Sequence, residues 1–160
     1  MAPEIPTETT HNTSIQGATG PLTGLRILDF TSLLPGPYAT QLLADMGADV
    51  VRIETTLRPD LVRFMEPQVG TGSAAHATLH RNKRSLGLDL KHPDARDVIH
   101  QLIATYDIVI EQFRPGVMSR LKLDYSSLRH VNPALIYCSV TGYGQTGAYS
   151  TKAGDDINYL

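Results

Sequence analysis

The sequence has few of the features that mark secreted, membrane-spanning or nucleic-acid-binding proteins. Its single cysteine, Cys138, rules out an internal disulfide or a cysteine-rich zinc site and favours a reducing intracellular compartment. No apolar run approaches the roughly 20 residues of a membrane-spanning helix. Fourteen basic and sixteen acidic residues give a net charge of −2, without the basic excess of a general nucleic-acid binder. We therefore expect neither membrane nor nucleic-acid partners.

The first 20 residues differ in composition from the rest of the chain. They lack the basic start and apolar stretch of a signal peptide, and they contain acids but no arginine, unlike a transit peptide. We expect residues 1–20 to form a disordered tail. The expected location is cytoplasmic by default, with the mitochondrion and the peroxisome left open. The total of 160 residues suffices for one domain that buries roughly 70% of its unfolded surface.

From Pro21 onward, short apolar runs alternate with segments of helical spacing. Strands are expected at 25–30, 49–54, 85–91, 107–113 and 134–140. Helices are expected at 38–47, 94–106, 115–121 and 125–131, the first of them closed by a glycine. The long, weakly periodic segment 55–82 is expected to be a loop with short helical pieces, and its length suggests a function. This alternation predicts an α/β fold with an open parallel sheet and ligands at the carboxyl ends of its strands.

Two features partly match a dinucleotide-binding fold. Residues 142–147 (GYGQTG) follow the last expected strand with the spacing of a glycine fingerprint, but neither the required helix nor the distant acid follows. A glycine turn, or a loop whose backbone approaches a ligand, is the alternative. Glu54 ends the second expected strand, where a ribose-binding acid would lie. However, the first loop, 31–37, has one glycine and two prolines, so side chains must supply the charge for any phosphate.

Basic side chains that could supply this charge occur in loops and at strand ends between residues 55 and 120. Arginine suits phosphates through its planar fork, and lysine acts as a point charge. A solvated surface position is the alternative for each of them. They are Arg58, Arg63, Arg81, Lys83, Arg84, Lys91, Arg114 and Arg120.

Signals for metal or hydrolase chemistry are weaker. His76 and His80 are four residues apart, but no third ligand has suitable spacing, so paired surface histidines are expected and no metal. No Gly-x-Ser-x-Gly elbow supports a serine hydrolase. Asp155 and Asp156 are adjacent after a glycine-rich loop, where one carboxylate could accept a proton near neutral pH. An exposed turn or a helix N-cap is the alternative.

Six blocks in a specific order extend these observations: 21–29, 35–54, 81–91, 111–117, 132–137 and 141–147. Together they resemble the class III (family III) CoA-transferase and alpha-methylacyl-CoA racemase superfamily over residues 21–160. The resemblance implies a Rossmann-like open parallel sheet with flanking helices, here the N-terminal part of a large domain that binds coenzyme A. It also implies acyl-CoA and carboxylic acid substrates, no metal, and a homodimer of interlocked chains.

The resemblance also implies positions near coenzyme A. Gln112 stands where asparagine or glycine is often found. Thr55 stands where many members carry an arginine for the phosphates, and we expect Arg58 to substitute for it. The implied cofactor-binding positions are Leu34, Pro35, Leu88, Asp89, Lys91, Gln112, Phe113, Arg120, Gly154, Asp156 and Tyr159.

The last eight residues bear on the reaction. They resemble the racemase branch, except that Asp155 replaces its catalytic histidine and is our candidate catalytic residue. The transferase branch uses an aspartate nucleophile that forms a mixed anhydride and then a CoA thioester. In both branches the second acid follows the point where this sequence stops, and Asp156 matches a substrate-contacting aspartate. Three hypotheses stay open: an acyl-CoA-processing enzyme of either branch, a CoA-binding module without catalysis, and a truncated product that does not complete its fold.

Overall fold

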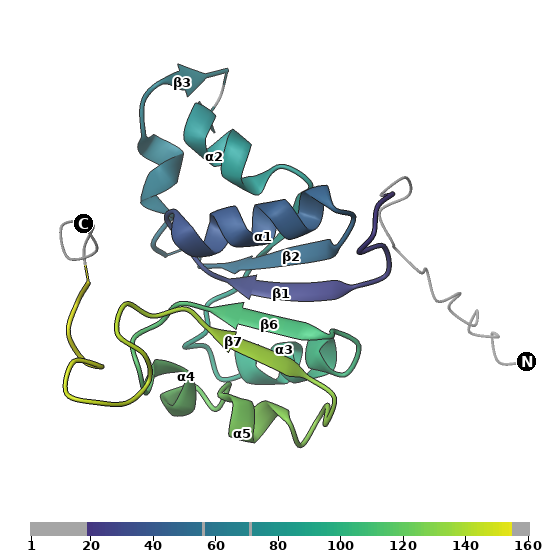
Figure 1. Ribbon diagram of the computed structural model, residues 1–160, viewed down its shortest axis with the longest axis vertical. Coiled ribbons are helices and arrows are strands. Elements are labelled where there is room, and N and C mark those ends of the chain that lie inside the picture. Colours follow the sequence, from purple (N-terminus) through teal and green to yellow (C-terminus); the bar gives the residue numbers. More distant parts are fainter. Residues whose placement is uncertain (1–18, 56, 71, 155–160) are drawn as a thin grey trace, which may run out of the picture.

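The computed structural model describes residues 19–55, 57–70 and 72–154 (Figure 1). Most of the tail expected at 1–20 therefore lies outside the described residues. Five parallel strands form the main sheet, in the order β5-β2-β1-β6-β7. They are β1 (Arg26–Phe30), β2 (Asp49–Glu54), β5 (Lys83–Gly87), β6 (Ile108–Glu111) and β7 (Ile136–Ser139). The predicted α/β fold with an open parallel sheet is confirmed.

The strand order locates the ligand-binding edge of the sheet. Counted along the chain, the five parallel strands are arranged 3-2-1-4-5, which is the Rossmann order. The order in which strands are added to the sheet reverses between β1 and β6. These two parallel strands pair from Ile27 with Ile108 to Phe30 with Glu111. Ligands of doubly wound sheets bind at such a switch point, outside the carboxyl ends of the strands. The crevice expected between the ends of β1 and β6 is therefore the candidate ligand site.

Alternating side chains bury both faces of the sheet. On one face, Leu28 and Phe30 pack with Ile99 and Ile103 of α3 (Ala95–Ile103). On the other, Ile27 and Val50 pack with Ala44 of α1 (Pro35–Asp45). Figure 1 shows α1 on one side of the sheet and α3, α4 and α5 on the other. The crevice thus opens at the end of a sheet with a buried core on both faces.

Helix α1 begins three residues before the expected start at Tyr38. Proline is well suited to the first position of a helix, because it lacks only an N–H that would have no partner there. Tyr38 then donates its backbone N–H to the Leu34 carbonyl oxygen at 2.9 Å. At Gly36 the helix lies so close to the crevice that an added Cβ would be 2.6 Å from the Gln112 Oε1. The missing side chain therefore lets the start of α1 approach the end of β6.

The strand expected at 85–91 runs instead from Lys83 to Gly87. It pairs with β2 only as far as Glu54, where β2 ends. Beyond that point the chain turns: Asp89 accepts the backbone N–H of His92 at 2.9 Å with its carbonyl and that of Lys91 at 3.0 Å with its carboxylate. Leu88 and Leu90 keep the alternating pattern because both pack against the core. Strand pairing, and not apolar alternation, decides where β5 ends.

The segment expected to be a long loop contains short elements. These are the 3-10 helix η1 (Leu61–Phe64), the antiparallel strands β3 (Gln68–Val69) and β4 (Gly72–Ser73), and the helix α2 (Ala74–His80). Two further short helices follow β6: α4 (Val117–Arg120) and α5 (Tyr125–Leu128). None of the helices in the described part of the chain has the length and hydropathy to cross a membrane.

Candidate functional site

The crevice is closed at its base by a contact between the two loops that flank the switch point. Gln112, directly after β6, donates its Nε2–H to the Ser32 carbonyl oxygen at 2.6 Å, and its Nε2 lies 3.3 Å from the Ser32 Oγ. Leu33, the next residue in the loop after β1, has a positive φ of 62°. Leu34 and Pro35 follow at the start of α1, and Leu34 is 61% exposed. The structure therefore brings Leu34, Pro35 and Gln112, all predicted site residues, to the switch point at the carboxyl ends of β1 and β6.

A buried charge pair supports the β1 side of this crevice. Asp29 accepts the backbone N–H of Thr31 at 2.9 Å and the hydroxyl protons of Thr31 and Thr40. Lys83 Nζ lies 3.4 Å from the Asp29 Oδ2 and donates to the Pro37 carbonyl oxygen at 2.8 Å. The two side chains are 0% and 1% exposed. Burial lowers the pKa of Lys83, and Asp29 opposes that shift. The pair joins β1 and β5 to the first turn of α1.

A second charge cluster joins the loops after β1 and β2. Asp60 accepts hydrogen bonds from the Arg52 Nη2 at 2.6 Å and from the backbone N–H of Leu33 at 3.1 Å. Glu54 lies 3.1 Å from Arg52 and 2.7 Å from Arg63. Burial alone would raise the pKa of Glu54, but hydrogen bonds from Arg63 and Ser85 and the nearby arginine charges lower it to about 2. Glu54, considered above as a ribose-binding acid, is thus already engaged by two arginines.

The eight basic residues between 55 and 120 divide into two groups. Four form ion pairs: Arg63 with Glu54, Arg81 with Asp45, Lys83 with Asp29, and Arg84 with Asp49. The other four are exposed and form no ion pair within the described ranges: Arg58, Lys91, Arg114 and Arg120. These four follow the carboxyl ends of β2, β5 and β6, so free positive charge gathers along the edge that carries the crevice.

The other predicted site residues lie along the same edge but not all in the crevice. Leu88, Asp89 and Lys91 follow β5, two strands away from β1. Phe113 packs against the core and donates its backbone N–H to Glu111 at 2.8 Å. Arg120 ends α4, and Gly154 is partly buried. The remaining three candidates, Asp155, Asp156 and Tyr159, lie outside the described residues.

Two residues at this edge were missed from the sequence. Asp60 is an isolated acid in a segment without periodicity, and its only signal was a position just before the apolar residues of η1. Its side chain caps η1 by accepting the backbone N–H of Val62. Glu111 ends an apolar strand and is 3% exposed, which the strand pattern does not reveal. The contacts of Asp60 with Arg52 and Leu33, and the burial of Glu111, depend on the folded structure and cannot be seen in the sequence.

The glycine-rich segment 142–147 is a loop in which Gly144 and Gly147 have positive φ values of 81° and 94°. Turns and bends follow it, and no helix begins between 148 and 154. The dinucleotide interpretation is therefore wrong, and the segment is a glycine-containing loop. In the described part of the chain, no group of three or more histidine, cysteine, aspartate or glutamate side chains could hold a metal ion.

His76 and His80 pair on α2 with ring centroids 4.6 Å apart, but they are not surface histidines. Both ring nitrogens of His80 and the Nε2 of His76 are buried without a hydrogen-bond partner in the regions described. Burial, together with the charges of Arg52 and Lys83, lowers the pKa of His80 to about 3. His80 therefore stays neutral well below the ordinary titration range of histidine.

This neutral histidine predicts a loss of stability in weak acid. The folded-state pKa is depressed, so the unfolded chain binds the proton more readily as the pH falls below about 6.5. Between pH 7 and pH 5 the free energy of unfolding should fall by about 1–2 kcal/mol on account of His80. Urea unfolding of wild type and His80→Leu at both pH values measures this, and the variant should show a smaller difference. A His130→Leu control, at an exposed position, should keep the wild-type difference. Equal pH dependence in wild type and His80→Leu would contradict the assignment.

Comparison with known proteins matches the sequence and the fold of this chain to one group. Residues 22–160 match CoA-transferase family III. The chain is 45% identical over 144 residues to a succinate–glutarate CoA-transferase of Agrobacterium fabrum, a match that covers 85% of this chain and 36% of the relative. It is 40% identical over 139 residues to an alpha-methylacyl-CoA racemase of Mus musculus, covering 87% and 32%.

Solved structures agree with these sequence matches. A crystal structure of a CAIB/BAIF family protein from Brucella suis aligns with a TM-score of 0.80 at 38% identity, over 87% of this chain and 38% of that one. The chain spans about a third of the length of the curated relatives cited above. The match over 22–160 and the shared parallel sheet lead to one conclusion: the chain belongs to CoA-transferase family III.

Proposed function

We propose that this chain binds coenzyme A and its thioesters along the crevice between β1 and β6, as part of an acyl-CoA-processing enzyme. The observation that carries the proposal is the free positive charge at this edge: four exposed basic side chains without an ion-pair partner in the described segments, beside a switch-point crevice. Coenzyme A carries several phosphate charges on a long, mostly uncharged arm. A crevice with cations along its rim suits such a ligand.

The two parts of the ligand would meet different parts of the edge. Arg58, Lys91 and Arg120 would face the phosphates, because the first loop lacks the glycines that bring backbone N–H groups to a pyrophosphate. The exposed Leu34 side chain and Pro35 would lie against the arm. Gln112 would form the base of the crevice through its contact with Ser32. In this arrangement Arg58 supplies the charge that Thr55 does not.

For the reaction, we propose CoA transfer between carboxylic acids, with racemisation of 2-methylacyl thioesters as the second candidate. Asp155 stands in place of the racemase histidine, and a carboxylate is the weaker base unless burial raises its pKa. The ending Asp156-Ile-Asn-Tyr159 favours the racemase branch instead. A CoA-binding part without catalysis of its own is the remaining alternative.

We further propose that the protein acts as a homodimer. An apolar row runs along the outer face of α1 at four-residue spacing, formed by Leu34, Tyr38, Leu42 and Met46. These side chains are 39–61% exposed. Exposed apolar surface of this kind marks an interaction site more often than a free face. A second copy would give the row a partner.

The binding proposal is tested by titrating coenzyme A into the purified chain in a calorimeter. We expect saturable binding that weakens as salt rises, because phosphate contacts are screened. Arg58→Ala should weaken binding about tenfold, which corresponds to the loss of one charged hydrogen-bond pair. Arg129→Ala is the matched control: Arg129 is exposed just after α5 and precedes the amino end of β7, at the opposite edge of the sheet. Unchanged binding in Arg58→Ala would overturn the role of Arg58, and no binding by wild type would overturn the proposed function.

A further inference from the structure

Glu111 is a buried carboxylate that has no counter-ion among the described residues. It ends β6, it is 3% exposed, and one of its oxygens accepts the Phe113 backbone N–H at 2.8 Å. Its other oxygen has no hydrogen-bond donor, and no basic side chain pairs with it, in the part of the chain that the structure describes. The buried acids Asp29 and Asp60, by contrast, each lie against a cation. Because a buried charge without a partner is costly, we expect a positive group beside Glu111.

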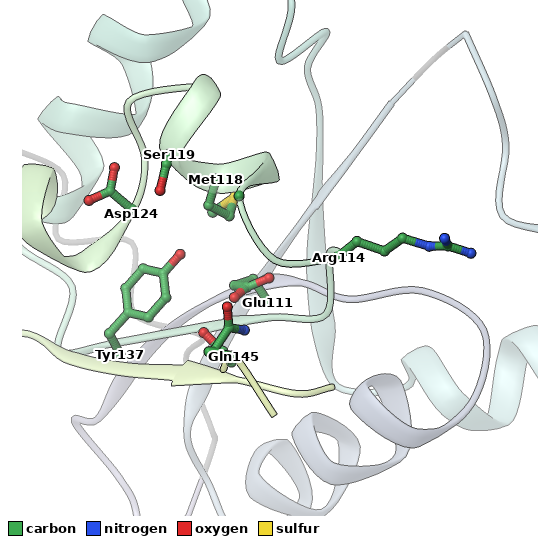
Figure 2. Close-up of a pocket in the computed structure, with 9 residues that line it drawn as sticks. Glu111, Arg114, Met118, Ser119, Asp124, Tyr137 and Gln145 are labelled. Atoms are coloured by element: carbon green, nitrogen blue, oxygen red, sulfur yellow. The ribbon is translucent and has the colours of Figure 1, made fainter. Parts of the chain in front are cut away.

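A small pocket lies against this carboxylate, between the ends of β6 and β7 and the helices α4 and α5, with a cavity volume of about 60 Å³ (Figure 2). Glu111 pairs in register with Ser139, and Tyr137 comes two residues before Ser139, so the three side chains share one face of the sheet. Ser119 of α4 and Gln145 of the glycine-rich loop also line the pocket. Figure 2 shows the hydroxyl groups of Tyr137 and Ser119 turned toward the same space. The sheet, a helix and a loop thus bring oxygen atoms around one carboxylate.

The other charged residues of the lining do not neutralise Glu111. The Asp124 carboxylate accepts the hydroxyl protons of two serines in α5, so it is already engaged. Of the lining residues, Arg114 alone is basic, and Figure 2 shows it extending away from the pocket. The Tyr137 hydroxyl donates to the Leu123 carbonyl oxygen at 3.2 Å, and burial raises its pKa, so the phenol stays neutral with lone pairs to offer. The pocket therefore presents one free negative charge and several oxygen atoms that can act as ligands.

We infer that this pocket binds a monovalent inorganic cation, with the free oxygen of Glu111 as its charged ligand. Carboxylate, hydroxyl and amide carbonyl oxygens are the ligands that hard cations prefer. A divalent ion would keep one positive charge uncompensated against a single free carboxylate. The volume is that of a few water molecules, which suits an ion with one or two water ligands and is too small for an organic ligand.

A cation at this position would tie the glycine-rich loop to the sheet. Gln145 lies in that loop between Gly144 and Gly147, whose positive φ values of 81° and 94° leave the backbone free of side-chain support. Coordination by the Gln145 amide oxygen would connect the loop to Glu111 at the end of β6. The inference goes beyond the proposed function, because it places an ion, and not coenzyme A, in a pocket of its own.

The test is a potassium titration of the ¹⁵N-labelled chain without coenzyme A, in which potassium chloride replaces tetramethylammonium chloride at constant ionic strength. Tetramethylammonium has the same charge, but its four methyl groups do not fit the pocket. The Phe113 amide, which donates to Glu111, should shift and saturate in the millimolar range. With potassium at about five times its dissociation constant, the unfolding temperature should lie about 2–4 °C above that in tetramethylammonium. Parallel titrations with sodium and ammonium identify the preferred ion.

Glu111→Gln is the decisive variant. The amide oxygen can still accept from the Phe113 N–H, but the amide NH₂ then faces the pocket and repels a cation, so the affinity should fall at least tenfold. Glu66→Gln is the control, because Glu66 is exposed and its carboxylate likewise accepts a backbone N–H two residues on, at Gln68. It should keep the wild-type affinity. Should Glu111→Gln fail to fold, Ser139→Ala removes a neighbouring oxygen ligand and should weaken binding about threefold.

Two results would overturn the inference and leave the proposed function standing. The first is a Phe113 resonance that does not respond to potassium, sodium or ammonium, which would mean that the pocket holds only water. The second is a wild type without a response and an Arg114→Gln variant that responds, which would mean that Arg114 turns inward and neutralises Glu111 itself. Loss of the response in Glu111→Gln, with the response kept in Glu66→Gln and Arg114→Gln, supports the cation site.

Discussion

Replacing Lys83 by methionine is expected to destabilise the folded chain by about 3–5 kcal/mol, the loss typical of a buried ion pair deprived of one partner. Lys83 donates to the Pro37 carbonyl oxygen and to Thr40, and its charge lies 3.4 Å from Asp29. Methionine fills a similar volume but leaves the Asp29 carboxylate buried without a cation. Urea unfolding followed by circular dichroism measures the loss as a lower midpoint at unchanged slope.

Arg96→Met is the matched control for this prediction. Arg96 also pairs with an acid, Asp97, but the two side chains are 51% and 67% exposed. Surface pairs of this kind contribute about 1 kcal/mol or less. If Lys83→Met destabilised the chain no more than Arg96→Met, the buried pair would not be the support of α1 that the contacts indicate.

Replacing Asp60 by asparagine is expected to cost about 2–4 kcal/mol, because a hydrogen-bonded buried charge is lost and Arg52 keeps only Glu54 as an acidic partner. The same change should loosen the loop after β1, since Asp60 accepts the Leu33 backbone N–H at 3.1 Å. Thermal unfolding measures the first effect. Hydrogen exchange at the Leu33 amide measures the second, which should be faster than in wild type.

Asp97→Asn removes an exposed acid whose partner, Arg96, is exposed as well, so it should leave both readouts close to wild type. A variant Asp60→Asn with wild-type exchange at Leu33 would show that the loop after β1 holds its conformation without Asp60. The Gln112–Ser32 contact and the Asp29–Lys83 pair would then hold the loop without Asp60.

The core of the fold could be predicted because its signals are local. The runs at 26–30 and 49–54 are apolar enough to indicate buried strands. Asp29 and Arg52 interrupt them, but each has a charged partner inside the protein. The strand at 85–91 was predicted too far along the chain because Leu88 and Leu90 continue the alternation for packing alone. The length of β2, which is distant in the sequence, decided the end of β5.

Part of the candidate site could also be predicted, where its signals are local in the sequence. The positions of exposed residues beyond the strand ends, such as Lys91 and Arg120, can be predicted from the order of the strands and helices along the chain. Residues that act through a partner do not: nothing near Arg63 in the sequence indicates that Glu54, nine residues earlier, neutralises it. Asp60 and Glu111 owe their roles to burial and to contacts across the sheet edge. Charge alone could therefore not separate the four free cations from the four paired ones.

The most direct test of the account is to map bound coenzyme A on the ¹⁵N-labelled chain by amide chemical shifts. The account predicts that saturating coenzyme A moves the amide resonances of the non-proline residues in 32–36, 88–91 and 112–116, at the carboxyl edge, and leaves those of Ile99, Leu128 and Val131 in place. Shifts confined to the outer face of α3 or α5, with the edge residues unmoved, would contradict the proposed binding site.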